Sequence, residues 1–248
     1  LTLSGDNSGA TGGVTLTTGT LNINNANALG TGAFTITAGT IDNSTAGSIT
    51  NSGNNAQSWN GDFTFTGTQS LNLGTGAVTF NASRQVTVSA NTLTVGGAIS
   101  NASYNLTKAG AGTLTLNGTT TITNLTISAG TLSTTSAAFS IAGNWSNSGT
   151  FTAGTGTVTF NGISTQTINS GGSNFYNVTL SNNAFTLLTN AMTVGGNLVI
   201  SEAKTPTITA TTSEAFTVTG TTDGVTGGSA ETLTVNTTGA VTFTGAVG

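Results

Sequence analysis

The sequence has little charge and lacks cysteine and histidine altogether. Of its 248 residues, three are Lys or Arg, seven are Asp or Glu, and none is Cys or His. Charged residues make up 4% of the chain, against about 25% in ordinary soluble domains. The composition therefore excludes thiol nucleophiles and every catalytic triad that contains a histidine. With so few cations, no basic surface can hold phosphates, and we expect no nucleic-acid partner.

Proline and long apolar runs are also scarce. Pro206 is the only proline, which suits a chain of continuous strands because proline removes a donor from the β-ladder. No stretch approaches the roughly 18 consecutive apolar residues of a membrane-spanning helix, so we expect no membrane-spanning segment. The chain starts at Leu1 without a methionine or a signal peptide. We therefore expect residues 1–248 to be part of a longer or processed extracellular chain.

What the sequence does contain is alternation of apolar residues with Thr, Ser or Asn. Examples are "VTLTTGTLNI" (14–23), "FTFTG" (63–67) and "TLTLNGTTTITNLTIS" (113–128). A period of two with many β-branched residues is the pattern of a half-buried strand, and Gly, Asn and Ser break it at turn-like intervals. These features predict an all-β protein.

Short phrases recur along the chain. "GTGAVTF" (74–80) has near-copies at 30–36, 154–160 and 237–243, and "GT" plus an apolar residue recurs about twenty residues apart in places. Self-similarity at this period is typical of a solenoid with one repeat per coil. We expect residues 1–248 to form a single β-solenoid with degenerate repeats. A row of β-sandwich domains is the alternative, and it is less compatible with the near-absence of proline.

A β-solenoid makes specific predictions for the repeated phrase. Parallel strands should stack about 4.8 Å apart in roughly ten to thirteen coils, with glycine at the corners where φ is positive or the backbones pack closely. Val and Phe should point inward and Thr outward in every copy, since a one-residue slip exchanges the two faces. The residues concerned are Val78, Phe80, Val158, Phe160, Val241 and Phe243 (inward) and Thr79, Thr159 and Thr242 (outward).

One segment resembles a known family. "LTKAGAGTLTLNGTTTITNLTISAGTLS" (106–133) is similar to the passenger-associated repeats of autotransporters, whose pattern is G-x-G-T-L-T-L-x-G, a polar stretch and x-x-x-G-T-L. Residues 1–41 follow the same order, and residues 156–201 resemble repeats of large bacterial adhesin-like proteins. The resemblance implies a right-handed parallel β-helix that is extracellular or on a bacterial cell surface. Within residues 1–248 the pattern contains no membrane barrel and no inserted protease domain, so the resemblance leaves the secretion route and the activity open.

The few ionisable groups do not form a recognisable catalytic motif. All seven carboxylates are isolated in the sequence: Asp6, Asp42, Asp62, Glu202, Asp223, Glu214 and Glu231. One-coil spacing could stack Asp42 near Asp62 as an acid and a base, and Arg84 and Lys108 with Asp62 could imitate a lyase cluster. Solvated surface charges are the simpler interpretation. Asp6 and Asp223 are predicted to be turn residues rather than calcium ligands, and we expect no catalytic residue, metal site or cofactor.

Asparagine and tyrosine are the remaining residue types with possible roles at the surface. Asparagines at corners are expected to stack on those of the next coil, and several lie in N-x-S/T sequons that chance explains: Asn43, Asn105, Asn124, Asn144 and Asn177. Tyr176 in "NFYNVTL" could point outward as a sugar-stacking residue, although stacking inside a corner is the simpler role.

The sequence thus predicts a structural, non-enzymatic protein that forms a stalk, fibre or surface layer by self-assembly with neighbouring copies. Low charge leaves little electrostatic repulsion between such copies. An adhesin that binds a cell-surface glycan is the first alternative. An ice-binding solenoid is a second, against which the variable coil lengths argue because they would break the register of a T-x-T face. A polysaccharide lyase is the third.

Overall fold

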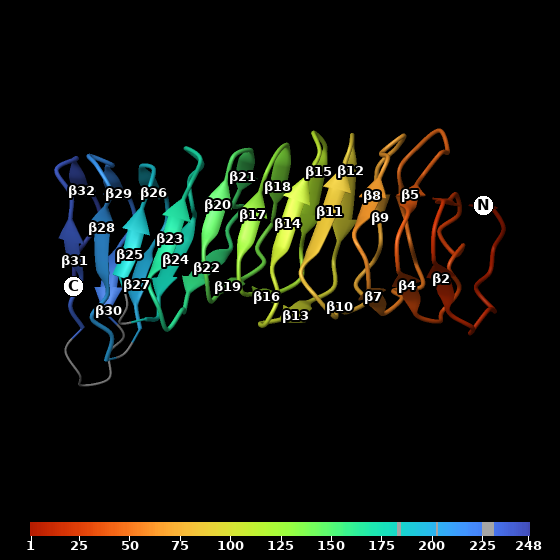
Figure 1. Cartoon of the computed structure of the whole chain (residues 1–248), viewed down its shortest axis with the longest axis horizontal. Helices are drawn as coiled ribbons and strands as arrows, with labels where there is room; N and C mark the ends of the chain where they lie inside the picture. The colour runs from red at the N-terminus through yellow and green to blue at the C-terminus, as the bar shows by residue number, and fades with distance from the viewer. Residues whose placement is uncertain (183–184, 202, 225–230) are drawn as a thin grey trace.

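The chain winds into a β-solenoid of about 11 turns with a repeat spacing of about 21 residues. The computed structural model describes residues 1–182, 185–201, 203–224 and 231–248, and within them it contains strands and no helix. The N- and C-termini lie at opposite ends of an elongated stack of coils (Figure 1). Every pair of neighbouring described strands is parallel. The predicted fold class and the expected number of coils are both confirmed.

Each complete turn contributes one strand to sheet B, then one to sheet A, then one to a third side that consists of sheets C and D. Sheet A contains β1 (Thr2–Leu3), β3 (Thr20–Ile23), β5 (Thr40–Asp42), β8 (Phe63–Phe65), β11 (Arg84–Val88), β14 (Leu106–Ala109), β17 (Leu125–Ile127), β20 (Trp145–Asn147), β23 (Gln166–Asn169), β25 (Phe185–Leu188), β28 (Thr207–Ala210) and β31 (Thr234–Asn236). Sheet B contains β2 (Val14–Leu16), β4 (Phe34–Ile36), β7 (Gln57–Trp59), β10 (Val78–Phe80), β13 (Ile99–Asn101), β16 (Thr120–Ile122), β19 (Phe139–Ile141), β22 (Thr157–Phe160), β24 (Asn177–Leu180), β27 (Leu198–Ile200) and β30 (Thr222–Gly224).

The third side is divided along the axis. Sheet C contains β6 (Ile49–Thr50), β9 (Leu71–Asn72), β12 (Thr92–Val95), β15 (Thr113–Leu116), β18 (Thr131–Ser133) and β21 (Thr150–Thr152). Sheet D contains β26 (Met192–Val194), β29 (Phe216–Val218) and β32 (Val241–Phe243). A single bridge from Phe175 to Val194 extends sheet D by one residue toward sheet C.

The repeated phrase takes the predicted register. Val78 and Phe80 are buried while Thr79 between them is exposed. Val158 and Phe160 are likewise buried, and Thr159 is only partly covered. Apolar side chains of successive turns therefore form continuous ladders inside the solenoid, which is the main source of its stability.

The last copy of the phrase points the same way but is not buried. Val241 pairs with Phe216 and Phe243 with Val218, so both lie in inward-facing columns, as predicted. Val241 is nevertheless 43% exposed and Phe243 only partly buried. The reason is that β32 is the last strand of sheet D, and no further coil covers it.

The two glycines of the phrase have different structural roles. The first glycine has a positive φ in three copies, with 80° at Gly74, 64° at Gly30 and 54° at Gly154. The second packs against the coil below, so that a Cβ on Gly76 would lie 2.0 Å from the Asn55 carbonyl oxygen. Threonine separates them because only the flanking positions need glycine.

Substitution of Gly76 tests whether its close approach to the Asn55 carbonyl oxygen requires glycine, as distinct from a general effect of adding a methyl group. We expect Gly76→Ala to destabilise the fold by about 2 kcal/mol, because the coil below must shift to accommodate the new carbon. Gly47→Ala is the matched control, since nothing lies within 4 Å of its Cβ position and its φ is not positive. Urea denaturation measures both; equal stabilities of the two variants would contradict the stacking role.

Asparagines link successive turns at the corner that leads into sheet A. Asn124 donates from its backbone N and from Nδ2 to Asn105 Oδ1, at 3.1 and 2.8 Å. Asn144 N in turn donates to Asn124 Oδ1, and Thr167 N donates to Asn144 Oδ1 at 2.8 Å. The expected stacking of corner asparagines is confirmed, and it gives Asn105, Asn124 and Asn144 a structural role.

Unequal coils keep a common register in sheet C. Partner residues in consecutive strands from β9 to β21 are separated by 22, 21, 18 and 19 residues. The extra residues are accommodated in the corners, while the strands pair residue for residue. The sequence-based argument that variable coil lengths would break the register of a T-x-T face is therefore wrong.

Candidate functional site

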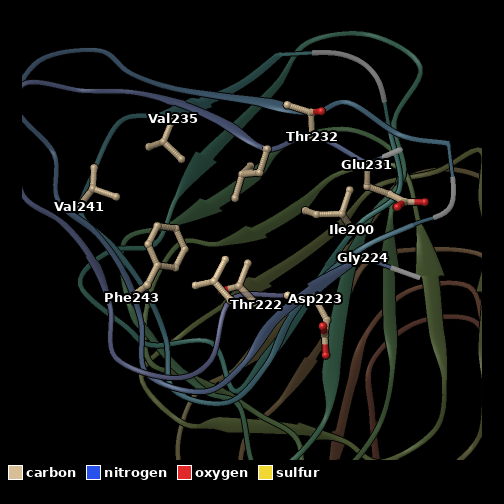
Figure 2. Close-up of a pocket in the computed structure, with 12 residues that line it drawn as sticks. Ile200, Thr222, Asp223, Gly224, Glu231, Thr232, Val235, Val241 and Phe243 are labelled. Atoms are coloured by element: carbon tan, nitrogen blue, oxygen red, sulfur yellow. The ribbon is translucent and has the colours of Figure 1, made fainter. Parts of the chain in front are cut away.

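The larger of the two hollows at the ends of the solenoid lies at the C-terminal end, where the described residues of the last coil leave the interior open (Figure 2). Its volume is about 640 Å³. Apolar side chains from three sheets supply most of its wall: Ile200, Leu233, Val235, Val241, Phe243 and Val247. Phe243 packs edge-on against Phe216 of the preceding coil, with 6.1 Å between the ring centroids.

Two carboxylates stand at the rim of this hollow. Asp223 pairs with Val199 in the outward column of sheet B, and its carboxylate points away from the apolar wall (Figure 2). Glu231 accepts a hydrogen bond from the backbone N of Ala203 at 3.2 Å. The hollow is thus chemically suited to bind apolar side chains, and its two carboxylates do not face each other across it.

The N-terminal end has a similar but smaller opening. It encloses about 370 Å³, and its apolar wall comes from Leu1, Val14, Leu16 and Leu21. The first strand of sheet A, β1, pairs only with β3, and the first strand of sheet B, β2, pairs only with β4. Each of these strands therefore has one edge whose backbone groups lack a strand partner.

The structure does not bring Asp42 and Asp62 together. β5 pairs with β8 so that Ile41 lies beside Phe65, which places Asp42 four residues further along the ladder than Asp62, or about 13 Å. Asp42 is buried, and its two oxygens accept hydrogen bonds from the backbone N and the hydroxyl of Thr68 at 3.0 and 2.6 Å. The acid–base pair considered from the sequence is not formed. The simpler interpretation of Asp42 as a solvated surface charge is also wrong, because its carboxylate is buried.

The second candidate cluster is only partly assembled. Arg84 Nη1 lies 3.8 Å from Asp62 Oδ1, and Arg84 Nε donates to the Trp59 carbonyl at 3.0 Å. Lys108, by contrast, points into the interior between Val86 and Ile127 in the ladder of sheet A. The three residues therefore do not form the lyase-like cluster considered from the sequence.

Lys108 is the one charged side chain that the described residues bury completely. Its Nζ donates to the carbonyls of Ala109, Gly110 and Ala129 at 2.9, 2.8 and 3.1 Å. Desolvation lowers the pKa of Lys108 from 10.5 to about 8, because burial disfavours the charged form. The lysine closes a corner between two turns, and its amine has its donors directed at backbone oxygens.

No three of the described Asp or Glu side chains form a group that could hold a metal ion. Asp6 Oδ1 accepts from Ser8 N at 2.8 Å, and this bond lowers the pKa of the exposed carboxyl. Asp6 is therefore a turn residue, as predicted. The same prediction is wrong for Asp223, which lies in strand β30 and pairs with Val199. Glu202 lies outside the described residues.

Asn43 and Tyr176, two residues for which the sequence suggested a surface role, lie in different environments. Asn43 is buried, and its Nδ2 donates to the carbonyls of Gly47 and Ser70, so its amide is committed inside the fold. Tyr176 is 41% exposed. Its ring is therefore on the outer surface rather than stacked inside a corner, which corrects the simpler of the two interpretations.

Comparison with protein-family models, with curated proteins and with solved structures found no match to this chain. The class that the fold defines is a parallel β-solenoid, and the closer assignment to autotransporter repeats stays a prediction. Among the described residues there is no helix long and apolar enough to cross a membrane.

Proposed function

We propose that this chain is a non-enzymatic structural component of an extracellular or cell-surface assembly, in which copies associate end to end. The observation that carries the proposal is the continuous in-register stack of parallel coils, whose end coils in residues 1–248 both present apolar side chains. The sequence resemblance to bacterial surface repeats supports the location. The separation of the candidate catalytic groups within the described residues supports a structural role.

The two ends are complementary because of the way a solenoid is built. Every internal junction joins the trailing edge of one coil to the leading edge of the next, in the same direction. A second copy can therefore continue sheet A from β31 to β1, and sheet B from Val247, which bridges to Thr222 of β30, to β2, while the two apolar ends cover each other. A head-to-tail contact of this kind does not close on itself and gives open filaments.

A charge at the C-terminal end should prevent this contact. We expect Val241→Lys to abolish the concentration-dependent increase in sedimentation coefficient, because an ammonium cannot be buried against apolar groups without a partner. Thr242→Lys is the matched control, since Thr242 adjoins Val241 but faces outward. A wild-type chain that sediments as a monomer at all concentrations, or equal behaviour of the two variants, would contradict end-to-end association.

Glycan binding is the second candidate function, and the exposed ring of Tyr176 favours it. An aromatic side chain on a neutral surface offers an apolar face on which a sugar ring can stack. Glycan-array binding that is lost in Tyr176→Ala, from a chain that does not associate, would support the adhesin and count against the structural proposal.

A further inference from the structure

Sheet C presents a two-dimensional array of hydroxyl groups. In β12, β15, β18 and β21 the two outward positions hold Thr or Ser in every strand: Thr92, Thr94, Thr113, Thr115, Thr131, Ser133, Thr150 and Thr152. They pair in register, for example Thr94 with Thr115 and Thr115 with Ser133. Parallel strands lie about 4.8 Å apart and alternate residues about 6.6 Å apart along a strand, so the hydroxyls form a regular lattice.

Among the residues that the structure describes, none of these eight hydroxyl groups makes a hydrogen bond with another group of the protein. Each hydroxyl can donate one hydrogen bond and accept two. The array therefore offers its whole hydrogen-bonding capacity to whatever lies on it.

The surface around the array carries no charge. Residues 85–201 contain a single charged residue, Lys108, and Lys108 is buried. A neutral surface excludes an ionic partner, and the outward positions of sheet C contain no aromatic ring on which a sugar could stack. The chemistry that remains is a neutral, periodic partner that both donates and accepts hydrogen bonds.

We propose that the outward face of sheet C binds ice. Each hydroxyl contributes little, because an ordered water bonded to a surface group costs up to about 2 kcal/mol of immobilisation entropy. Many such sites on one rigid scaffold act together only when the partner repeats with a matching period. Liquid water has no such period, whereas ice holds its molecules in a fixed lattice. The face is separate from the two ends, so ice binding does not depend on end-to-end association.

The other two sheets lack a comparable array. In sheet B each strand of the repeated phrase has one outward hydroxyl between two buried apolar residues, as Thr79 in β10. In sheet A the outward positions of β11 and β14 mix Gln85 and Thr87 with Thr107 and Ala109. The three sides of one turn therefore provide internal controls for sheet C.

The experiment compares three variants of the same turn. Thr115, Thr121 and Thr126 lie in sheets C, B and A, and all three are half-buried and outward. We expect the wild-type chain to show thermal hysteresis and to adsorb to ice. Thr115→Tyr should lower the hysteresis by about half or more, because a ring standing above the lattice separates neighbouring hydroxyls from the ice.

Thr121→Tyr and Thr126→Tyr should keep the wild-type hysteresis, and circular dichroism should show the same β-fold in all three variants. The absence of hysteresis and ice adsorption in the wild-type chain would overturn the proposal. So would equal losses in the three variants, or adsorption to crystalline cellulose without adsorption to ice.

Discussion

Replacement of Trp145 by alanine is expected to lower the free energy of unfolding by about 4 kcal/mol, the cost of truncating a large core side chain. Trp145 is almost completely buried. Its ring packs edge-on against Phe151 and Phe175, with centroid distances of 4.7 and 5.0 Å. The turn that contains Trp145 is the last with a strand in sheet C, and Phe175, which bridges to Val194 of sheet D, lies in the next turn. This aromatic cluster therefore joins the two parts of the third side.

Equilibrium urea unfolding measures this change in the free energy of unfolding. It is followed by far-UV circular dichroism, because tryptophan fluorescence changes when Trp145 is replaced. Ser146→Ala is the control, because Ser146 follows Trp145 in β20 but points outward, and we expect it to stay within about 0.5 kcal/mol of wild type. Trp145→Phe should keep most of the stability, since Trp145 Nε1 has no hydrogen-bond partner among the described residues. A loss below about 1 kcal/mol in Trp145→Ala would show that the aromatic cluster contributes little to the free energy of unfolding.

The second large effect is a rise in stability at alkaline pH. The pKa of Lys108 is 10.5 in the unfolded chain and about 8 in the folded chain. Between these values the unfolded state binds more protons than the folded state, so the free energy of unfolding increases with pH. The shift corresponds to a gain of about 3 kcal/mol over this window.

The measurement is urea unfolding at several values between pH 7 and pH 10.5 for the wild type and for Lys108→Met. Methionine fits between Val86 and Ile127 in the ladder and does not titrate. Subtracting the variant's curve removes the contribution of the tyrosines and of Lys204. A difference that stays constant across the window would show that Lys108 is not desolvated in the folded chain.

Most of the fold follows from the sequence because alternation and glycine spacing are local signals. Once the strand is recognised, Val78 and Phe80 are predicted to point inward and Thr79 outward, since a strand has only two faces. The roles of Gly74 and Gly76 also follow from the repeated phrase, because corners of stacked coils need positive φ or close packing.

What the sequence did not reveal depends on which coils lie beside each other. Charge alone suggests a cluster of Lys108 with Arg84 and Asp62, whereas Leu106 and Lys108 are two residues apart in one strand and so share a face. The alternation of faces along the strand therefore predicts that Lys108 points inward, as Leu106 does. The register of the threonines in sheet C could not be predicted, because coils of 18 to 22 residues differ in their corners.

End-to-end association is the central claim, and electron microscopy of the purified chain tests it most directly. With 12 strands in sheet A and about 4.8 Å between strands, each copy should add about 58 Å to the axis when β31 of one copy pairs with β1 of the next. We expect unbranched filaments with this repeat, whose length increases with protein concentration and changes little with salt because the contacts are uncharged. Separate rods of the length of one chain at every concentration would contradict the account.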